Sequence, residues 1–276
     1  MSEMSYLEKL LDGVEVEWLP LGEVSALRRG RVMSKGYLTE NFGPYPVYSS
    51  QTANNGKIGS INTFDFDGEY ISWTTDGANA GTVFYRTGKF SITNVCGLIT
   101  LKSKYSLIYK FLFYWLTIEA KKHVYSGMGN PKLMSHQVEN IPVPIPCPDN
   151  PEKSLAIQSE IVRILDKFTE LTAELTAELS MRKKQYNYYR DQLLSFKEGE
   201  VKWKTLGEIT EINTGQKPSE ILDKAATFDY INAGTSRSGY TTMSNCDGDT
   251  VTTPSRGQGG IGFVGYQKTP FWLGPL

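Results

Sequence analysis

Residues 171–179 read Leu171-Thr-Ala-Glu-Leu175-Thr-Ala-Glu-Leu179, a four-residue unit that occurs twice in tandem. The tandem lies inside residues 155–196, which contain neither glycine nor proline. A stretch of this length without helix breakers predicts one continuous helix. Because each four-residue copy changes the length of a helix by ~6 Å, the repetition indicates a helix whose length matters for function.

The apolar residues of this region form a seam along one side of the predicted helix. Their spacing alternates between four and three, as in a coiled coil, but two spacings of four follow each other at Leu175, a stutter that locally unwinds a supercoil. We expect a spacer helix within residues 151–198 that continues for ~40 residues, or ~60 Å, and its seam must pack against another helix. The seam residues are Ile157, Ile161, Ile164, Phe168, Leu171, Leu175, Leu179, Tyr186 and Leu193.

The region before the helix has a different texture. Residues 14–148 are rich in glycine, aromatic and β-branched residues, and turn pairs such as Asn55-Gly56 and Asp76-Gly77 recur in it. This pattern predicts short strands joined by tight turns. Apolar residues at helical spacing predict one inserted helix over residues 106–124, and the prolines of residues 142–148 predict an extended exit.

The sequence after the helix repeats the start of the chain. The stretch Val16-Glu-Trp18-Leu-Pro-Leu21-Gly22-Glu23 reappears as Val201-Lys-Trp203-Lys-Thr-Leu206-Gly207-Glu208, and Gly30 corresponds to Gly215. The predicted fold class is therefore α+β. It comprises a β-rich module with one inserted helix (residues 1–150), the spacer helix (151–198) and a partial second β-rich module (199–276). Residues 199–276 contain no counterpart of the inserted helix, the proline exit or the long helix.

Composition bounds the classes of function. The 276 residues carry 29 Lys and Arg against 30 Asp and Glu. No stretch reaches ~18 consecutive apolar residues, so we expect no membrane span. Three widely separated cysteines and the absence of a basic, apolar leader suit a reducing cytoplasm.

Motifs that carry chemistry are few. The two histidines, His123 and His136, are not spaced as a zinc site, and no nucleophile or methyltransferase motif accompanies them. The stretch Gly257-Gln-Gly259-Gly-Ile-Gly262 fits a dinucleotide-binding pattern, but residues 263–270 do not resemble the helix that such a site requires, so a turn explains it better. We therefore predict a binding protein with no catalytic residue, metal site or cofactor of its own.

The first module carries residues suited to contact with nucleic acid. Residues 20–150 hold 13 Lys and Arg against 9 Asp and Glu, a modest excess that permits contact with a polyanion. Side-chain amides read adenine edges, and cations contact phosphates. The expected DNA-binding residues come from a basic turn, an amide-rich loop and a glycine-flanked loop after the inserted helix: Arg28, Arg29, Arg31, Lys35, Gln51, Asn54, Asn55, Lys57, Asn130 and Lys132.

Several segments together resemble the specificity subunit of type I restriction-modification enzymes, particularly the IC group. The resemblance is carried by Trp18-Leu-Pro-Leu21-Gly22-Glu23, Asn140-Ile-Pro-Val-Pro-Ile-Pro146, Gln158-Ser-Glu-Ile161-Val-Arg-Ile-Leu165-Asp166-Lys-Phe168, the Thr-Ala-Glu-Leu tandem and Arg182-Lys-Lys-Gln-Tyr186. Residues 27–139 look like a target recognition domain in placement and texture alone. Residues 269–276 do not resemble the family's continuation, so the resemblance is to a C-terminally truncated subunit.

The resemblance implies a DNA-binding subunit that performs no chemistry itself. Such subunits carry two target recognition domains, each of which reads one half of a bipartite DNA site, and two antiparallel helices that set the distance between the halves. Two methylation subunits bring S-adenosyl-methionine, and motor-nuclease subunits bring translocation and cleavage that depend on ATP and Mg. The implied location is the cytoplasm.

Three further expectations concern partners and alternatives. Two copies of this chain are expected to pair their 151–198 helices antiparallel, because the exposed seam must be buried, and to present two identical modules to an interrupted palindrome. Two interpretations without DNA readout stay open. One is a coiled-coil oligomeric adaptor, and the other is a carbohydrate-binding module that uses Trp18, Trp73 and Trp115 as stacking platforms.

Overall fold

The computed structural model describes residues 10–127, 129–224, 226–255 and 260–275. The chain divides into two compact units, Met1–Tyr189 and Arg190–Leu276. Within the described ranges, no helix has the length and apolar character needed to cross a membrane. Gly257 and Gly259 of the predicted glycine-rich turn lie outside the described residues.

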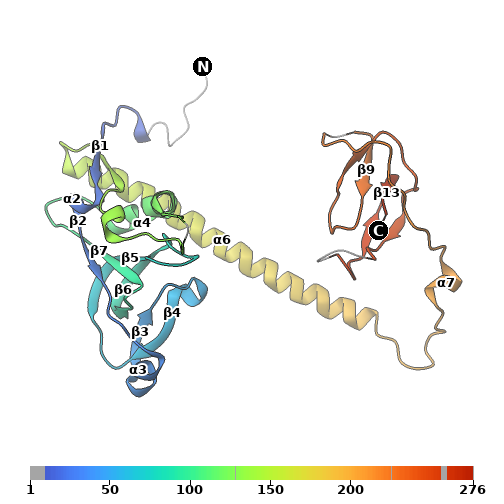
Figure 1. The fold of residues 1–276 in the computed structure, drawn as a ribbon, viewed down its shortest axis with the longest axis horizontal. Helices are drawn as coiled ribbons and strands as arrows, with labels where there is room; N and C mark the ends of the chain where they lie inside the picture. Colours follow the sequence, from blue (N-terminus) through green and yellow to red (C-terminus); the bar gives the residue numbers. More distant parts are fainter. Residues whose placement is uncertain (1–9, 128, 225, 256–259, 276) are drawn as a thin grey trace. The chain divides into compact units, whose positions relative to one another are not determined.

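A six-stranded mixed sheet forms the centre of the first unit (Figure 1). Its order is β2-β7-β5-β6-β3-β4, and neighbouring strands are antiparallel except for the parallel pair β3 and β6. The predicted turn-rich, strand-rich texture is confirmed by these elements: β2 (Ser25–Arg29), β3 (Phe42–Tyr48), β4 (Lys57–Ile61), β5 (Phe66–Thr74), β6 (Val83–Ile92) and β7 (Cys96–Leu101).

The sheet curls so that the end of β6 returns to the end of β2. A parallel bridge joins Arg31 to Thr93. A Cβ atom at Gly30 would overlap the carbonyl oxygens of Ile92 and Thr93, so only glycine fits this close approach. Because β7 and β5 lie between β2 and β6 in the sheet order, this contact requires the sheet to wrap round on itself.

Several short helices and a two-stranded ribbon share one buried core with β5, β6 and β7. The ribbon pairs β1 (Val16–Pro20) antiparallel with β8 (Pro142–Pro146), the predicted extended proline segment. Its alternate residues Val143 and Ile145 join a buried core with Leu21, Trp73 and Leu116. The helices of this unit are α2 (Leu21–Val24), α3 (Lys35–Glu40), η1 (Ala53–Gly56), α4 (Tyr109–Glu119), η2 (Ala120–His123) and α5 (Ser135–Val138).

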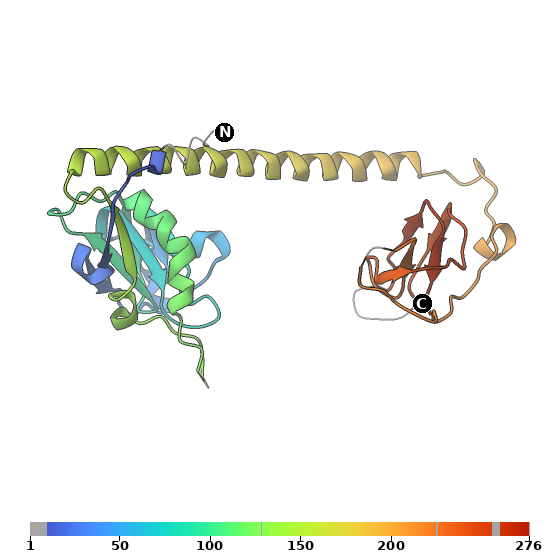
Figure 2. The ribbon, with the colours of Figure 1, turned by 90° about the horizontal axis from the view of Figure 1, so that it is seen from above.

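One helix, α6, runs without a break over Pro151–Leu193, through both Thr-Ala-Glu-Leu copies (Figure 2). Asn150 caps its start, because the Asn150 Oδ1 atom accepts a hydrogen bond from the Lys153 backbone N–H at 3.0 Å. The predicted long helix is confirmed, but its predicted end at 198 is wrong. Ser195 donates its hydroxyl to the Asp191 carbonyl, and this bond satisfies one of the last-turn acceptors outside the helix.

The second unit repeats the strand pairings of the first on a smaller scale. Its elements are α7 (Leu206–Ile209), β9 (Phe228–Ile231), β10 (Gly239–Thr241), β11 (Thr250–Thr252), β12 (Gly265–Gln267) and β13 (Phe271–Leu273). Strand β9 is antiparallel to β10 and parallel to β13, as β3 is to β4 and β6. We refer below to residues 16–146 as the first module and to residues 206–275 as the second module.

The predicted internal repeat is confirmed by an equivalent close approach in each module. A Cβ atom at Gly215 would overlap the carbonyl oxygens of Leu273 and Gly274, just as one at Gly30 would overlap those of Ile92 and Thr93. The correspondence of Gly30 and Gly215 is therefore a packing requirement and not a coincidence of sequence.

Candidate nucleic-acid interface

Three loops of the first module are tied together where β3 and β5 end. They are residues 49–57, residues 75–82, and residues 125–133 without residue 128, which lies outside the described ranges. The Asn79 side-chain amide donates to the Ser50 carbonyl at 3.1 Å, and the Gly77 N–H donates to the Pro131 carbonyl at 3.0 Å. An antiparallel bridge also joins Asp76 to Lys132. We call the surface of these loops the loop face.

The buried core fixes the position of the loop face. Trp73, at 1% exposure, donates its indole N–H to the Leu133 carbonyl at 3.0 Å. The Leu133 N–H in turn donates to the Thr75 carbonyl at 2.9 Å. Because Trp73 lies near the end of β5 and Thr75 directly follows this strand, the glycine-flanked loop after the inserted helix is held directly against the sheet.

The amide-rich loop takes a rare backbone conformation. Asn54, Asn55 and Gly56 are all left-handed, with φ values of 50°, 54° and 81°. Asparagine tolerates this region better than most residues, which explains the two successive asparagines. The Ser49 N–H donates to the Gly56 carbonyl at 2.9 Å, and the Gln51 amide donates to the Lys57 carbonyl at 2.6 Å. The predicted residues Gln51, Asn54, Asn55 and Lys57 are thus brought into one closed loop.

Arg29 joins the loop face from the end of β2. Its Nη2 atom donates to the Thr75 hydroxyl at 3.1 Å and to the Asn94 carbonyl at 2.6 Å, and lies 3.9 Å from an Asp76 carboxylate oxygen. These contacts connect Arg29 to the ends of two neighbouring strands. They also neutralise part of its charge.

The other three cations of the predicted basic turn are placed differently. Arg28 projects from the opposite side of β2, since successive strand residues face opposite ways. Arg31 contacts the Asp65 carboxylate at 3.0 Å and lies over the Tyr37 ring, and a hydrogen bond with Tyr37 together with Asp65 raises the pKa of Arg31. Lys35 lies on α3, which precedes β3, whereas the amide-rich loop follows β3. The structure therefore does not bring these three side chains to the loop face.

Lys57, Asn130 and Lys132 are exposed at the loop face. Neither lysine ammonium forms an ion pair with any residue that the structure describes. Both ammonium groups are therefore available to contact phosphates.

The loop 75–82 was predicted as a turn and not as part of the site. Its Asn79 side chain donates to Ser50 of the first loop, and its Gly77 N–H donates to Pro131 of the third. The signal in the sequence was Asn79, a side-chain amide that follows the turn pair Asp76-Gly77.

Helix α6 is fixed to the first module by a buried side-chain amide. Gln158, at 0% exposure, donates to the Ser106 carbonyl at 2.8 Å and accepts from the Ile108 N–H at 2.9 Å. These bonds hold residues 106–108 in an extended form, which explains why α4 begins at Tyr109 and not at 106 as predicted. The first module and the start of α6 are thus one rigid body.

An ion pair on the next turns of α6 adds to this attachment. The Asp166 carboxylate accepts from the Lys110 ammonium at 2.6 Å and from the Tyr114 hydroxyl at 2.7 Å. Burial raises the pKa of Asp166, but these two hydrogen bonds and the Lys110 charge lower it by more, so the pKa lies below its ordinary value of 3.8.

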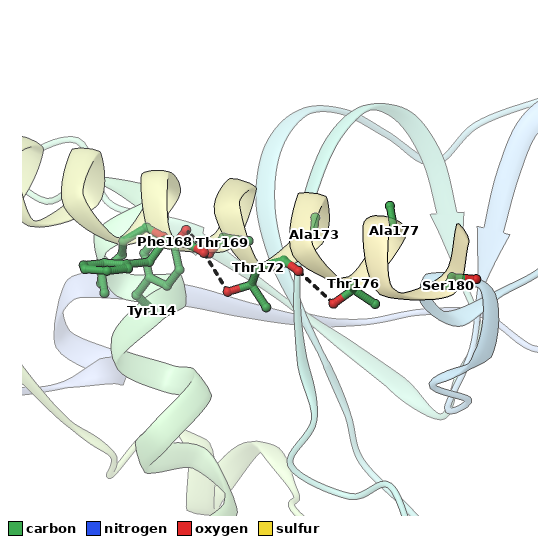
Figure 3. A pocket seen from close by; sticks show the side chains of 9 residues that line it. Tyr114, Phe168, Thr169, Thr172, Ala173, Thr176, Ala177 and Ser180 are labelled. Carbon is green, nitrogen blue, oxygen red and sulfur yellow. Dashed lines mark hydrogen bonds between the residues drawn. The ribbon is translucent and has the colours of Figure 1, made fainter. Parts of the chain in front are cut away.

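Beyond this attachment, the seam of α6 is exposed. Phe168 is 64% exposed, Leu175 is 56% exposed and Leu193 is 74% exposed. Beside the seam runs a shallow groove of about 720 Å³, lined along α6 by small residues (Figure 3). The Thr172 and Thr176 hydroxyls in it donate to helix carbonyls four residues earlier, so they present mainly methyl groups. Small side chains of this kind let a second helix approach closely.

Groups that could hold a metal ion are absent from the described residues, where no cluster of three His, Cys, Asp or Glu side chains occurs. His123 contacts the Glu119 carboxylate at 3.1 Å, four residues earlier on the same helical segment. His136 is exposed on α5. The geometry at the two histidines indicates surface side chains in local contacts.

Comparison with known proteins identifies the family. The family model described as type I restriction modification DNA specificity domain matches residues 13–181. The chain is 46% identical over 242 residues to the type I restriction enzyme EcoR124I/EcoR124II specificity subunit of Escherichia coli, a match that covers 80% of this chain and 54% of that protein. The chain thus spans about half the length of that relative.

Two further matches agree. A putative type I specificity subunit of Mycoplasma pneumoniae is 34% identical over 265 residues, covering 92% of this chain and 70% of that protein. The crystal structure of the type I restriction-modification S subunit from M. genitalium has the same fold, with a TM-score of 0.68 and 20% identity over 96% of this chain and 71% of that one. From these matches and the described fold, the chain belongs to the family of type I restriction-modification DNA specificity subunits.

Proposed function

We propose that this chain reads DNA sequence through the loop face of its first module. The observation that carries the proposal is that Asn54, Asn55 and Lys57 on one loop and Lys132 on another are held in one surface, because both loops are tied to the loop 75–82 and to the core. Side-chain amides distinguish base edges in the major groove, and lysines contact phosphates on either side. Family membership supports the same conclusion.

This proposal is tested by selecting the preferred DNA sequence from a library and measuring how binding to it depends on salt. The chain is incubated with a library of randomised duplexes, the bound fraction is sequenced, and binding to the enriched motif is measured at rising salt. If the chain contacts phosphates, its affinity for DNA should fall steeply as salt rises. A coiled-coil adaptor should bind no DNA. A carbohydrate-binding module, which stacks aromatic rings on sugars, should show binding that depends little on salt.

Four variants then locate the reading surface. Lys57→Glu and Lys132→Glu are expected to weaken binding to all duplexes, and Asn54→Ala and Gln51→Ala to change the enriched motif more than the overall affinity. If all four variants kept the wild-type motif and affinity, the loop face would not be the reading surface.

We further propose that α6 sets the distance between two half-sites. Its attachment through Gln158 and Asp166 makes it a rigid extension of the reading module. One four-residue copy corresponds to ~6 Å of helix, and one base-pair step to ~3.4 Å. Deletion of residues 176–179 is therefore expected to shorten the preferred gap between half-sites by about one or two base pairs. An unchanged gap would contradict the proposal.

Two copies of this chain are proposed to supply the two half-sites, through antiparallel pairing of their α6 seams. Most positions of the seam recur at the same distance on either side of Leu175. Ile157 and Leu193 are equidistant from it in sequence, as are Leu171 and Leu179, and the two spacings of four at the stutter fall at the centre. A twofold axis through Leu175 therefore places Ile157 opposite Leu193, Ile164 opposite Tyr186 and Leu171 opposite Leu179 of the second copy, whereas Phe168 lies opposite Arg182.

Cysteine crosslinking tests both the pairing and its register. In a background with Cys147→Ser and Cys246→Ser, Leu175→Cys is expected to form a disulfide between copies under mild oxidation. Leu171→Cys alone is expected to form none, but a mixture of Leu171→Cys and Leu179→Cys chains should crosslink. Self-crosslinking of Leu171→Cys indicates a parallel pair, and a monomer at micromolar concentration by light scattering excludes the dimer.

The partners of the family are proposed for this chain as well. We propose that it directs two copies of a methylation subunit, which would carry S-adenosyl-methionine, and a motor-nuclease subunit that would use ATP and Mg, in the cytoplasm, and that it has no catalytic role of its own. Mapping methylated adenines in DNA from cells with and without this chain tests the assignment. Identical maps would contradict it.

A further inference from the structure

Arg86 is a buried cation directly beneath the amide-rich loop. It is 3% exposed and lies on β6. Its Nη1 atom donates to the Asn55 carbonyl at 2.8 Å, and its Nε atom donates to the Ser72 hydroxyl at 3.0 Å. A Cβ atom at Gly56 would lie 3.0 Å from its Nη2 atom. The guanidinium is thus in contact with two of the three left-handed residues of the loop.

No carboxylate among the described residues pairs with this guanidinium. Burial lowers the pKa of Arg86 to about 10, which leaves it protonated at neutral pH. Its charge is instead placed between two rings, 3.6 Å from the centre of Tyr48 and 4.4 Å from that of Phe84. A buried charge is costly unless its hydrogen bonds are satisfied, so this arrangement indicates a role in fixing the loop.

The second module has the same arrangement with a shorter side chain. Residues 262–267, Gly-Phe-Val-Gly-Tyr-Gln, correspond to residues 81–86, Gly-Thr-Val-Phe-Tyr-Arg. Thr252 pairs with Gly265 as Ser72 pairs with Phe84. Gln267 therefore occupies the position of Arg86, and its Nε2 atom donates to the Thr252 hydroxyl at 3.3 Å, as Arg86 does to Ser72.

Because the Gln267 side chain is shorter than that of Arg86, the two modules differ in what supports the loop that follows β3 or β9. In the second module, a hollow of about 390 Å³ lies between Gln267 and the loop residues 234–237. In the first module, the guanidinium reaches the loop carbonyl. Within the described residues, Gln267 forms no hydrogen bond to residues 234–237.

We propose that Arg86 is a positioning residue for DNA readout, which holds Asn54 and Asn55 of the amide-rich loop in the geometry that selects the base sequence. The inference rests on the proposed readout by the loop face. Arg86 does not touch DNA in this arrangement, because it is covered by the loop that it supports.

The experiment compares Arg86→Gln, which copies the second module, with Arg86→Lys and with Lys89→Gln in the full chain. Lys89 is an exposed cation on the same strand and serves as the matched control for loss of one charge. Each protein is tested for its motif in the randomised duplex library, for its affinity for that motif and for an unrelated duplex, and for amide hydrogen exchange of residues 49–57.

Arg86→Gln is expected to lose about tenfold or more in affinity for the wild-type motif, with unchanged binding to the unrelated duplex and faster exchange in residues 49–57. Arg86→Lys should recover little, because an ammonium keeps the charge but not the two directed bonds. Lys89→Gln should match the wild type. If Arg86→Lys restored full motif affinity, charge alone would matter, and the proposal would be overturned.

Wild-type motif, affinity and exchange in Arg86→Gln would overturn it too. If Arg86→Gln melted far below the wild type, Gly56→Ala would test the same contact from the loop, and unchanged motif affinity in that variant would count against the proposal. Enrichment of no motif by the wild-type chain would contradict the proposed function instead. In that case the exchange of residues 49–57 still decides whether Arg86 fixes the loop.

Discussion

In the first module, Leu21 and Val24 of α2 are fully buried, whereas the corresponding Leu206 and Ile209 of α7 in the second module are 69% and 59% exposed. The two short helices have closely similar sequences, Leu-Gly-Glu-Val and Leu-Gly-Glu-Ile. Their different environments arise from what surrounds them. In the first module α2 packs in a core that also contains residues of β7, α4 and β8.

Strand β7 accounts for much of the difference. In the first module it pairs with both β2 and β5 and thereby joins them into one sheet. The described part of the second module has no counterpart of β7, and there β11 and β12 form one small sheet while β10, β9 and β13 form another. The pairing of neighbouring strands thus forms in both modules from local sequence. Burial of the short helix, in contrast, requires β7, which joins β2 and β5 into one sheet.

The largest expected effect is a difference in unfolding free energy between matching substitutions in α2 and α7. Leu21→Ala is expected to lower the free energy of unfolding by about 2–5 kcal/mol, because it leaves a cavity in a closed core. Leu206→Ala should change it by less than about 0.5 kcal/mol, as an exposed substitution does. Urea unfolding of the full chain, followed by tryptophan fluorescence, measures both. An equal loss in the two variants would mean that α7 is packed as tightly as α2.

The next largest effect is a loss of stability that we expect in both modules when a Cβ atom is added at the close approach. Gly30→Ala and Gly215→Ala each place a Cβ atom onto a carbonyl oxygen of the strand opposite, and each is expected to cost about 1–3 kcal/mol. Gly207→Ala, with no atom within 4 Å of the new Cβ, is the control and should be neutral or slightly stabilising. A neutral Gly215→Ala would show that the second module does not form the close approach seen in the first.

The sequence was most informative where a pattern repeats. Helix α6 was predictable because periodic apolar residues continue for many turns without glycine or proline, and only its end was misplaced. The internal repeat was predictable from Trp18 and Trp203 and from the paired glycines. Both signals are local or periodic, so they do not depend on knowing the fold.

Contacts between distant residues were not predictable in this way. Arg86 is separated by 31 residues from Asn55 and by 14 from Ser72, and nothing in its neighbourhood marks it as buried. The side chains of Arg28 and Arg29 differ in direction because of strand alternation, which a run of basic residues conceals. The loop face itself arises from the curl of the sheet, and a single sequence does not show which turns meet.

A smaller effect concerns the attachment of α6 to the first module, for which the described second module shows no equivalent. Gln158→Ala removes the partners of the Ser106 carbonyl and the Ile108 N–H, and is expected to cost about 1–3 kcal/mol, the penalty of unpaired buried groups. Gln185→Ala, on the exposed part of the same helix, is the control and should change little. Thermal unfolding measures both, and equal melting temperatures would show that the buried amide does not hold the helix.

The smallest expected effect is a pH dependence at Asp166. Its pKa is lower in the folded chain than its ordinary value of 3.8, so its contribution to stability is present above that value and is lost as the pH falls through the lower, folded pKa. Because the Asp166 and Lys110 side chains are 38% and 37% exposed, the contribution should stay below about 1 kcal/mol. Urea unfolding at about pH 7 and about pH 3 should therefore show a smaller difference for Asp166→Asn than for the wild type.

Glu178→Gln, at an exposed pair with Arg182, should behave like the wild type. An identical pH dependence in Asp166→Asn would mean that Gln158 and the apolar contacts alone hold α6 against the first module.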